Sequence, residues 1–282
     1  MEIISDSGAM QEQARAWRTE GRTIAFVPTM GYFHQGHLSL MRYGREQGRR
    51  LVVSLFVNPA QFGPSEDLDR YPRDLERDAG LAAAEGVDVL FTPTAGDMYP
   101  SGYQTYVEVG ELSRGLCGAS RPGHFRGVAT VVLKLFNLAA PDVAVFGEKD
   151  YQQLRVIQQM AADLNLPVRV VGRPIVREPD GLALSSRNTY LSIEERRAAL
   201  SLIQGLNAAA ARAAGGERRA EALLGAARAV ITASPLVRLD YLELADPDTL
   251  KPVERLQGAA RLLTAAWVGA TRLIDNILIE GD

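Results

Sequence analysis

Short apolar segments alternate with helix-like stretches over the first 175 residues of this 282-residue chain, and this alternation constrains the fold more than any other feature. The apolar segments are near-continuous runs of Val, Leu, Ile and Phe, a pattern typical of strands that are buried on both faces of a parallel sheet. The predicted strands are 23–27, 51–57, 87–91, 143–146 and 168–171. The helices predicted near and between them are 38–47, 74–85, 125–138 and 151–164. This order predicts an α/β fold, a Rossmann-like, doubly wound parallel sheet.

The pattern changes after Val176. A polar loop leads to Ser192, which has Glu195 three residues later and so forms the signature of a helix capping box. Two alanine-rich helices, 193–214 and 217–233, are predicted to follow, and then three strands, 238–244, 260–268 and 271–279. We therefore predict two domains, a Rossmann-like domain over 1–175 and a smaller α+β domain over 176–282.

The bulk composition excludes several classes of protein. With 46% apolar residues, 23% charged residues and a net charge of −3, the chain has the composition of a soluble globular protein with no overall attraction for nucleic acid. Apolar runs stay well short of the roughly 20 residues that span a bilayer, and the N-terminus does not resemble a signal peptide. Cys117 is the single cysteine, so an intrachain disulfide is excluded. A cytoplasmic protein that binds neither membrane nor nucleic acid is expected.

Two of the three histidines fall in one short segment, Pro28–His37, directly after the first predicted strand of the sheet. His34 and His37 are separated by Gln-Gly, where the strand gives way to a helix. The N–H groups and the dipole at the start of a helix favour anions, and imidazole donors placed there add hydrogen bonds to phosphate oxygens. The usual phosphate-loop and dinucleotide-binding motifs do not occur in the sequence. The alternative is that the two histidines only cap the helix or pack in the core.

Polar segments follow other predicted strands. Asn58–Phe62 follows the second strand, and Gly147–Asp150 follows the fourth. Ligands of parallel sheets bind beyond the carboxyl ends of the strands, which favours a functional role for both segments. The alternatives are a simple turn for the first and a solvated run of charges for the second. His124 precedes a long apolar helix. Either it caps this helix or packs in the core, or its segment is functional and the neighbouring arginines help to hold an acid substrate.

Four segments together resemble the pantothenate synthetase (pantoate:β-alanine ligase) family of the nucleotidyltransferase superfamily, whose HIGH-type signature matches the histidine segment. They are 28–37, 56–62, 146–154 and 184–188, and they occur in the family's order. The resemblance implies an ATP-dependent ligase that joins (R)-pantoate to β-alanine through a pantoyl adenylate and releases pyrophosphate and AMP. It also implies that the second domain acts as a lid.

The resemblance assigns roles to individual residues. The catalytic residues that it implies are His37, His34, Lys149 and Arg187. The implied ATP-binding residues are Met30, Gly31, Tyr32, Phe33, His34, Gln35, Gly36, His37, Gly147, Glu148, Lys149, Asp150, Val176, Leu184, Ser185, Ser186 and Arg187. Gln61 is implied to bind pantoate and β-alanine, and Gln153 to bind pantoate.

The resemblance further implies a homodimer, with ATP as substrate and Mg²⁺ carried on its phosphates rather than on protein ligands. Many family members have Ala-Leu where this chain has Tyr32-Phe33, so larger rings stand in the nucleotide loop, and we expect them to reshape the mouth of the pocket. Two other functions remain open at this point. One is a nucleotidyltransferase that acts on another small molecule, and the other is a nucleotide-binding regulator without catalytic turnover.

Overall fold

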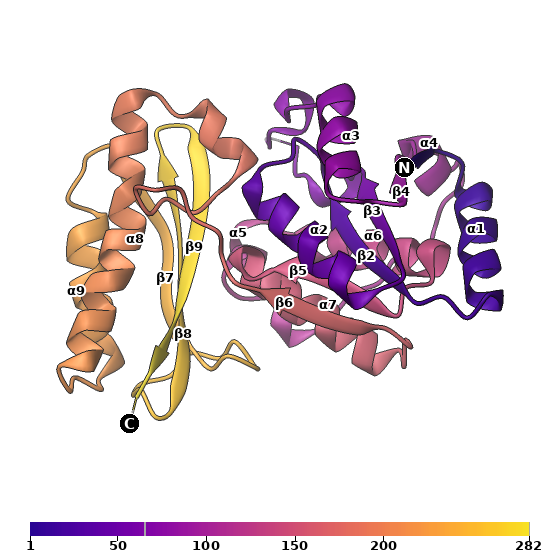
Figure 1. Cartoon of the computed structure of the whole chain (residues 1–282). Coiled ribbons are helices and arrows are strands. Elements are labelled where there is room, and N and C mark those ends of the chain that lie inside the picture. The colour runs from indigo at the N-terminus through magenta and orange to yellow at the C-terminus, as the bar shows by residue number, and fades with distance from the viewer. Residues whose placement is uncertain (65, 282) are drawn as a thin grey trace. The chain divides into compact units, whose positions relative to one another are not determined.

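The chain forms two compact units in a computed structural model that describes residues 1–64 and 66–281 (Figure 1). The first unit comprises Met1–Ser113, Arg121–Glu148 and Gln153–Pro174. The second comprises Arg114–Ser120, Lys149–Gln152 and Ile175–Asp282, of which Asp282 lies outside the described residues. The domain limits expected from the sequence, 1–175 and 176–282, stay a prediction.

The first unit is built on a parallel six-stranded sheet with the strand order β1-β4-β3-β2-β5-β6. The strands are β1 (Glu2–Ile4), β2 (Ile24–Thr29), β3 (Arg50–Leu55), β4 (Val89–Phe91), β5 (Val143–Gly147) and β6 (Arg169–Arg173). From β2 the chain builds the sheet outward in one direction through β3 and β4, and later in the other direction through β5 and β6. This confirms the doubly wound α/β fold.

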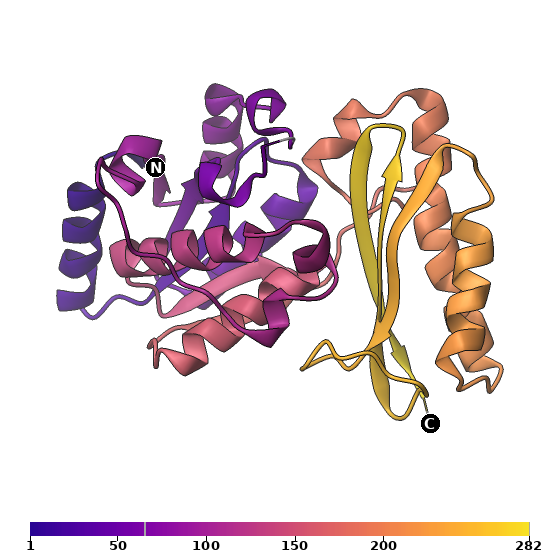
Figure 2. The ribbon, with the colours of Figure 1, turned by 180° about the vertical axis from the view of Figure 1, so that it is seen from behind.

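Helices cover both faces of this sheet. Helices α2 (Gln35–Gln47) and α3 (Leu75–Ala84) lie on the face that is in front in Figure 1, and α6 (His124–Ala139) and α7 (Tyr151–Asp163) lie on the face that is in front in Figure 2. Helix α1 (Ser7–Thr19) packs against α6. The remaining short helices are α4 (Ala95–Met98), α5 (Cys117–Ser120), η1 (Pro59–Gln61), η2 (Leu68–Arg70), η3 (Glu111–Ser113) and η4 (Glu148–Asp150).

The sheet is buried on both faces, as the apolar runs predict. Phe26 of β2 is fully buried and meets Phe136 of α6 edge-to-face at 6.3 Å between ring centroids. Phe136 also meets Phe146 of β5 at 6.5 Å, so one aromatic ring joins α6 to two central strands. On the other face, Val27, Met41 and Leu51 are fully buried in a second cluster. These contacts fix the strands whose ends carry the candidate site.

Two elements of the first unit were not predicted from the sequence, β1 and α1. Strand β1 has only three residues, two of them exposed, so its apolar signal is weak. Helix α1 begins after Asp6, whose carboxylate accepts a hydrogen bond from the Ala9 N–H at 2.7 Å. An aspartate in this position is a common N-cap, so the sequence does contain a signal for this helix.

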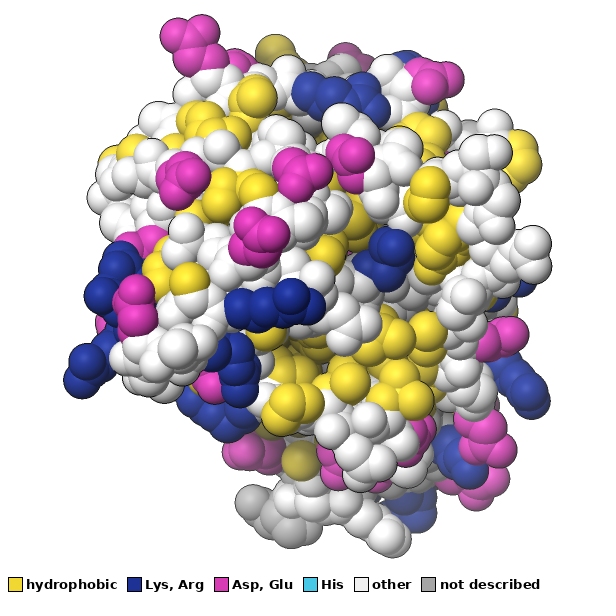
Figure 3. Space-filling view, turned by 90° about the vertical axis from the view of Figure 1, so that its right-hand side faces the viewer, with side chains coloured by type: hydrophobic (Ala, Val, Ile, Leu, Met, Phe, Trp, Pro, Cys, Tyr) yellow, Lys and Arg dark blue, Asp and Glu magenta, His cyan; other side chains and the backbone are white. Residues whose placement is uncertain are grey.

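Figure 3 shows the side of the first unit on which α1 and α4 lie in Figure 1. Hydrophobic, acidic and basic side chains are all exposed on this side. Hydrophobic side chains gather there in a hollow among acidic and basic ones, and no histidine is visible on this face. Within the described part of the chain, no helix is both long enough and apolar enough to cross a bilayer.

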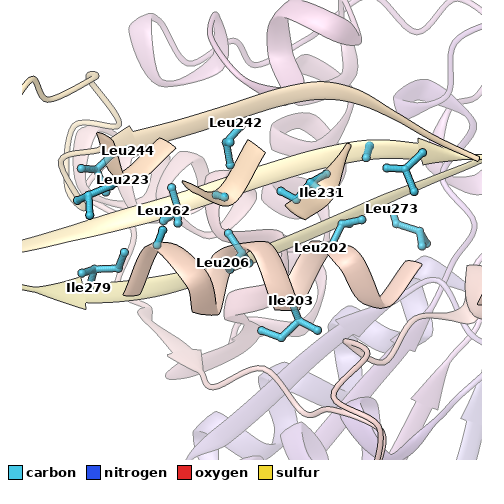
Figure 4. Packing of buried hydrophobic residues seen from close by; sticks show 14 of the residues in the cluster. Leu202, Ile203, Leu206, Leu223, Ile231, Leu242, Leu244, Leu262, Leu273 and Ile279 are labelled. Carbon is cyan, nitrogen blue, oxygen red and sulfur yellow. The ribbon is translucent and has the colours of Figure 1, made fainter. Parts of the chain in front are cut away.

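The second unit packs two helices on an antiparallel sheet of three strands, as predicted. The helices are α8 (Ile193–Ala214) and α9 (Ala220–Ile231), and the strands are β7 (Val237–Ala245), β8 (Ala259–Val268) and β9 (Thr271–Glu280), with η5 (Ser186–Tyr190) before α8. Leu202 and Leu206 of α8 point into a core that also holds Leu244 and Leu262 of the sheet (Figure 4). The capping box of Ser192 and Glu195 is confirmed.

Close packing of α8 on α9 depends on a glycine. A Cβ at Gly205 would lie 2.5 Å from Ile231 Cγ1 and 2.8 Å from the Ala227 carbonyl oxygen. Gly225, inside α9, has no atom within 4 Å of the position of its missing Cβ. The two glycines therefore form a matched pair, one required by packing and one not.

We predict opposite effects for alanine at these two positions. Gly205→Ala forces α8 and α9 apart and is expected to lower the free energy of unfolding by about 1–3 kcal/mol. Gly225→Ala is expected to raise it by about 0.5–1 kcal/mol, because alanine loses less backbone entropy in a helix. Urea unfolding followed by circular dichroism measures both. Equal effects of the two substitutions would contradict this account of the helix pair.

Candidate active site

The candidate site of the first unit lies at the point where the sheet changes direction. Strands β2 and β5 are parallel neighbours, with Ala25 paired to Val143 and Phe26 to Ala144. The chain leaves β2 for one half of the sheet and leaves β5 for the other, and ligands of such sheets bind beyond the carboxyl ends at this point. Met30–His37 follows β2, and Gly147 ends β5. The structure thus brings the histidine segment and Gly147-Glu148 to the same edge of the sheet.

Both histidines of the segment cap helix α2. His34 is the N-cap residue, and its Nδ1 accepts a hydrogen bond from the Gly36 N–H at 3.1 Å. His37 lies in the first turn, and its Nδ1 accepts from the His34 N–H at 3.4 Å. The two rings stack with centroids 4.1 Å apart and planes inclined by 30°. The capping role that the sequence left open is therefore real, and it uses one nitrogen of each ring.

Capping also determines what the other ring nitrogen does. An Nδ1 that accepts from a backbone N–H carries no proton, so in the neutral imidazole the proton is on Nε2. Each Nε2 is therefore a hydrogen-bond donor, on a ring whose orientation is held by the start of α2. Donors held in this way at a helix N-terminus suit phosphate oxygens. The capping role and the ligand-binding role are compatible.

The loop between β2 and α2 is held by a buried carboxylate of α3. Asp78 accepts from the Tyr32 N–H at 2.5 Å and from the Phe33 N–H at 2.7 Å. Burial raises the pKa of the Asp78 carboxyl, and these hydrogen bonds oppose that effect. Gly31 and Tyr32 have φ angles of 84° and 52°, in the left-handed region that favours glycine. Asp78 thus holds a loop conformation that a tyrosine rarely adopts.

The two rings that depart from the family pattern have different positions. Phe33 is fully buried in the cluster between α2 and the sheet, and its ring lies 5.6 Å from that of His37. Tyr32 is half-buried, with the Arg77 guanidinium 4.9 Å from its ring centroid, and Arg77 also donates to the Phe33 carbonyl at 2.7 Å. Both residues lie in the loop, as expected, and the Phe33 side chain packs inward; their effect on the mouth of a nucleotide pocket stays a prediction.

Gln61 lies in η1, directly beyond β3, and is buried. Its Oε1 accepts from Asn58 Nδ2 at 3.0 Å, and its Nε2 contacts Met30 Sδ at 3.3 Å. Asn58 in turn accepts from the Tyr99 hydroxyl at 2.7 Å, and burial raises the pKa of this phenol, which keeps it a donor. The structure therefore brings Gln61 and Met30 together. The turn that the sequence left as an alternative is present as η1, with a polar side chain held inside it.

The other predicted ATP-binding residues lie in the second unit. Val176 and Leu184 are joined by a backbone hydrogen bond of 3.0 Å, next to an antiparallel bridge between Arg177 and Ala183. The segment that follows is fixed by Asn188, which donates to Glu178 at 2.9 Å and to the Ala183 carbonyl at 3.1 Å. A hairpin and a short 3₁₀-helix therefore present Ser185, Ser186 and Arg187.

Lys149 and Asp150 lie in η4, and they group with the second unit. The Lys149 carbonyl accepts from Asn276 Nδ2 at 3.0 Å, which ties this short helix to β9. Gln153 is half-buried in the first turn of α7. The roles of all these residues stay predictions. Among the residues that the structure describes, there is no cluster of three or more His, Cys, Asp or Glu side chains that could hold a metal ion.

Comparison with known proteins agrees with this architecture. A sequence model of the family described as pantoate-beta-alanine ligase matches residues 2–278. The chain belongs to the pantoate-beta-alanine ligase family. It is 58% identical over 276 residues to a pantothenate synthetase of Syntrophotalea carbinolica, with 98% of each chain covered. It is 55% identical over 283 residues to a pantothenate synthetase of Nitratidesulfovibrio vulgaris, with 100% of each chain covered.

Solved structures of the ligase family also match this fold. The pantothenate synthetase of Thermus thermophilus has a TM-score of 0.93 and 47% identity, over 98% of this chain and 99% of that one. A pantoate-beta-alanine ligase of Francisella tularensis, solved in complex with beta-gamma ATP and beta-alanine, has a TM-score of 0.82 and 33% identity, over 99% of this chain and 97% of that one. Membership of the ligase family therefore rests on the whole chain rather than on one motif.

We predict that Asp78→Asn loosens the loop between β2 and α2. An amide offers one oxygen and turns an NH₂ group toward a backbone N–H, so one buried donor loses its acceptor, at a cost of about 1–3 kcal/mol. Hydrogen exchange measured by mass spectrometry is expected to show faster exchange in peptides that contain Tyr32 and Phe33. Glu76→Gln, at an exposed position of the same helix, is the matched control. Equal protection in both variants would contradict the role of Asp78.

Proposed function

We propose that the protein condenses pantoate with β-alanine to give pantothenate, AMP and pyrophosphate, through a pantoyl adenylate. The observation that carries the proposal is the pair of Nε2 donors of His34 and His37, fixed by capping at the carboxyl end of β2. Family membership over residues 2–278 supports it, as does the relative that was solved with beta-gamma ATP and beta-alanine.

The first step needs stabilisation of charge on phosphate. A carboxylate oxygen of pantoate attacks the α-phosphorus of ATP, a new P–O bond forms, and pyrophosphate leaves with the electrons of the broken bond. Negative charge gathers on the α-phosphoryl oxygens and on the leaving group. Donors that are already oriented stabilise such charge without reorganisation, which suits His34 and His37. In the second step the β-alanine amine attacks the acyl carbon and AMP leaves.

Gln61 suits the two acids. Its amide both donates and accepts, so it can meet a carboxylate or a hydroxyl of pantoate and then the β-alanine that replaces it. Its place beside Met30, at the ends of adjacent strands β3 and β2, supports this assignment. We assign Gln153, in the first turn of α7, as a second pantoate ligand.

Residues of the second unit are proposed to bind the triphosphate. Lys149 and Arg187 supply the cations, and Ser185 and Ser186 supply hydroxyl groups. We propose that the second unit acts as a lid that closes on ATP and pantoate and excludes water from the adenylate. Small-angle scattering tests the lid, because closure predicts a smaller radius of gyration when both ligands are added.

Three further features stay predictions of the family resemblance. They are Mg²⁺ that arrives on the phosphates of ATP, a homodimer and a cytoplasmic location. Magnesium belongs to the substrate complex in this proposal, because it usually keeps several waters and binds substrate phosphates.

One assay separates the proposed ligase from the other two functions. AMP and pyrophosphate are followed with ATP and pantoate, with and without β-alanine. The ligase predicts AMP release that depends on β-alanine. A nucleotidyltransferase that acts on another molecule predicts neither product from pantoate, and a regulator binds ATP without turnover. Folded protein that releases no AMP when all three substrates are present would contradict the proposal.

We predict that His37→Ala lowers the rate of adenylate formation by roughly 100-fold or more, as expected for the loss of an oriented charge-stabilising donor. Single-turnover measurement of pyrophosphate release from ATP and pantoate isolates this step. Glu46→Ala changes an exposed residue on the same helix and is expected to leave the rate unchanged. An unchanged single-turnover rate in His37→Ala would remove this residue from the mechanism.

A further inference from the structure

A chain of polar contacts leads from Glu66 to the backbone of Gln61. Arg121 donates to both carboxylate oxygens of Glu66, at 2.8 Å from Nε and 2.5 Å from Nη2. The other terminal nitrogen of Arg121, Nη1, lies 3.0 Å from His124 Nε2. His124 Nδ1 lies 2.9 Å from the Gln61 carbonyl oxygen. Arg121 Nη2 also donates to the Gln61 carbonyl oxygen at 3.4 Å. Arg121, and His124 at the start of α6, thus converge on one backbone group, and Glu66 holds Arg121 in place.

The direction of every hydrogen bond in this chain is determined. A guanidinium can only donate, so His124 Nε2 accepts from Arg121. In the neutral imidazole the proton is therefore on Nδ1, and Nδ1 donates to the Gln61 carbonyl, which can only accept. A proton on Nε2 would point at the guanidinium and would be repelled by its charge. The contacts consequently make His124 Nδ1 the donor to the Gln61 carbonyl.

The carboxylate at the far end keeps the arginine in place. Burial alone raises the pKa of Glu66, but the hydrogen bonds and the charge of Arg121, together with the charge of His124 and a hydrogen bond from the Gly63 backbone, outweigh it, and the pKa is lowered. Glu66 is therefore ionised at neutral pH, and its paired contacts fix the plane of the Arg121 guanidinium. Both side chains are mostly buried, at 22% exposed for Glu66 and 17% for Arg121. A pair with this geometry orients the histidine that it contacts.

Close packing against α6 also holds the backbone of Ala60 and Gln61 in place. A Cβ on Gly127 of α6 would lie 2.2 Å from the Ala60 carbonyl oxygen and 2.7 Å from the Gln61 nitrogen. Asn58 Nδ2 bridges the two elements, because it donates to the Gly127 carbonyl at 3.1 Å as well as to Gln61 Oε1. The backbone of η1 thus rests directly on α6, and His124, at the start of α6, fixes its last residue.

We propose that Glu66, Arg121 and His124 are positioning residues that set the place of Gln61 and thereby the binding of pantoate and β-alanine. The inference rests on the proposed function, in which Gln61 binds both acids. Arg121 is occupied by Glu66, by His124 and by the Gln61 carbonyl, so it acts through these contacts rather than as a ligand of the acid substrate. The contacts from Glu66 to Gln61 predict a selective effect. Binding of pantoate and β-alanine depends on these contacts, and binding of ATP does not.

The test uses three substitutions of His124 in the full-length protein. The amide nitrogen of an asparagine side chain takes a position similar to that of histidine Nδ1, and that of a glutamine takes a position similar to Nε2. His124→Asn can therefore still donate to the Gln61 carbonyl, whereas His124→Gln and His124→Ala do not place a donor there. Loss of this one hydrogen bond is expected to raise KM for pantoate and for β-alanine roughly tenfold. KM for ATP is expected to stay within about twofold.

A second substitution acts on Glu66, at the other end of this series of polar contacts. Glu66→Gln removes the carboxylate charge that orients Arg121, and it is expected to raise the same two KM values by roughly three- to tenfold. Glu108→Gln, at an exposed position, is the matched control and is expected to change none of them. Thermal denaturation of each variant shows whether it is folded.

The results separate this inference from the function on which it rests. Recovery of both KM values in His124→Asn, but not in His124→Gln, supports the positioning chain. It is overturned if Asn and Gln behave alike, if all three KM values change together, or if none changes while the unaltered protein makes pantothenate. A folded, unaltered protein that makes no pantothenate instead contradicts the proposed function itself.

Discussion

The parallel pairing of β2 with β5 is the constraint on which the candidate site depends. These neighbours belong to the two halves of the sheet, and in sheets of this kind ligands bind beyond the carboxyl ends of such a pair. The segment after β2 then has to turn sharply into α2, which requires the positive φ angles at Gly31 and Tyr32. The histidines follow from this geometry, because the turn makes His34 the N-cap and puts His37 in the first turn.

The capping histidines show that stability and function use different atoms of one side chain. Each Nδ1 satisfies a backbone N–H at the start of α2, and each Nε2 is left as the donor nitrogen. An ordinary cap such as serine or aspartate satisfies the helix equally well but presents no second donor on a rigid ring. The sequence alone presents a structural and a functional interpretation as alternatives for this pair, but the capping geometry makes the two compatible.

The sequence predicts the elements well and the contacts between them poorly. Apolar runs located five of the six parallel strands, and the capping signature at Ser192 and Glu195 predicted the start of α8. The hydrogen bonds by which Asp78 holds the loop between β2 and α2 could not be predicted in this way. Asp78 lies 45 residues from Phe33, and no local pattern marks it as the acceptor for that loop. The inward position of Phe33 could not be predicted for the same reason, because it depends on the packing of α2 against the sheet.

The two units hold their candidate residues by the same principle. In the first unit, α3 and α6 supply buried polar groups, Asp78 and His124, that hold backbone atoms of short segments beyond β2 and β3. In the second, the Glu178 carboxylate accepts hydrogen bonds from Asn188 and Arg196 and so fixes the segment that carries Ser185–Arg187. Each segment is short, and side chains outside it hold its conformation: helices distant in sequence in the first unit, and Glu178 of the preceding hairpin in the second. Groups held in this way are already ordered before a substrate binds, so binding costs little further conformational entropy. Fixed dipoles stabilise developing charge best under this condition.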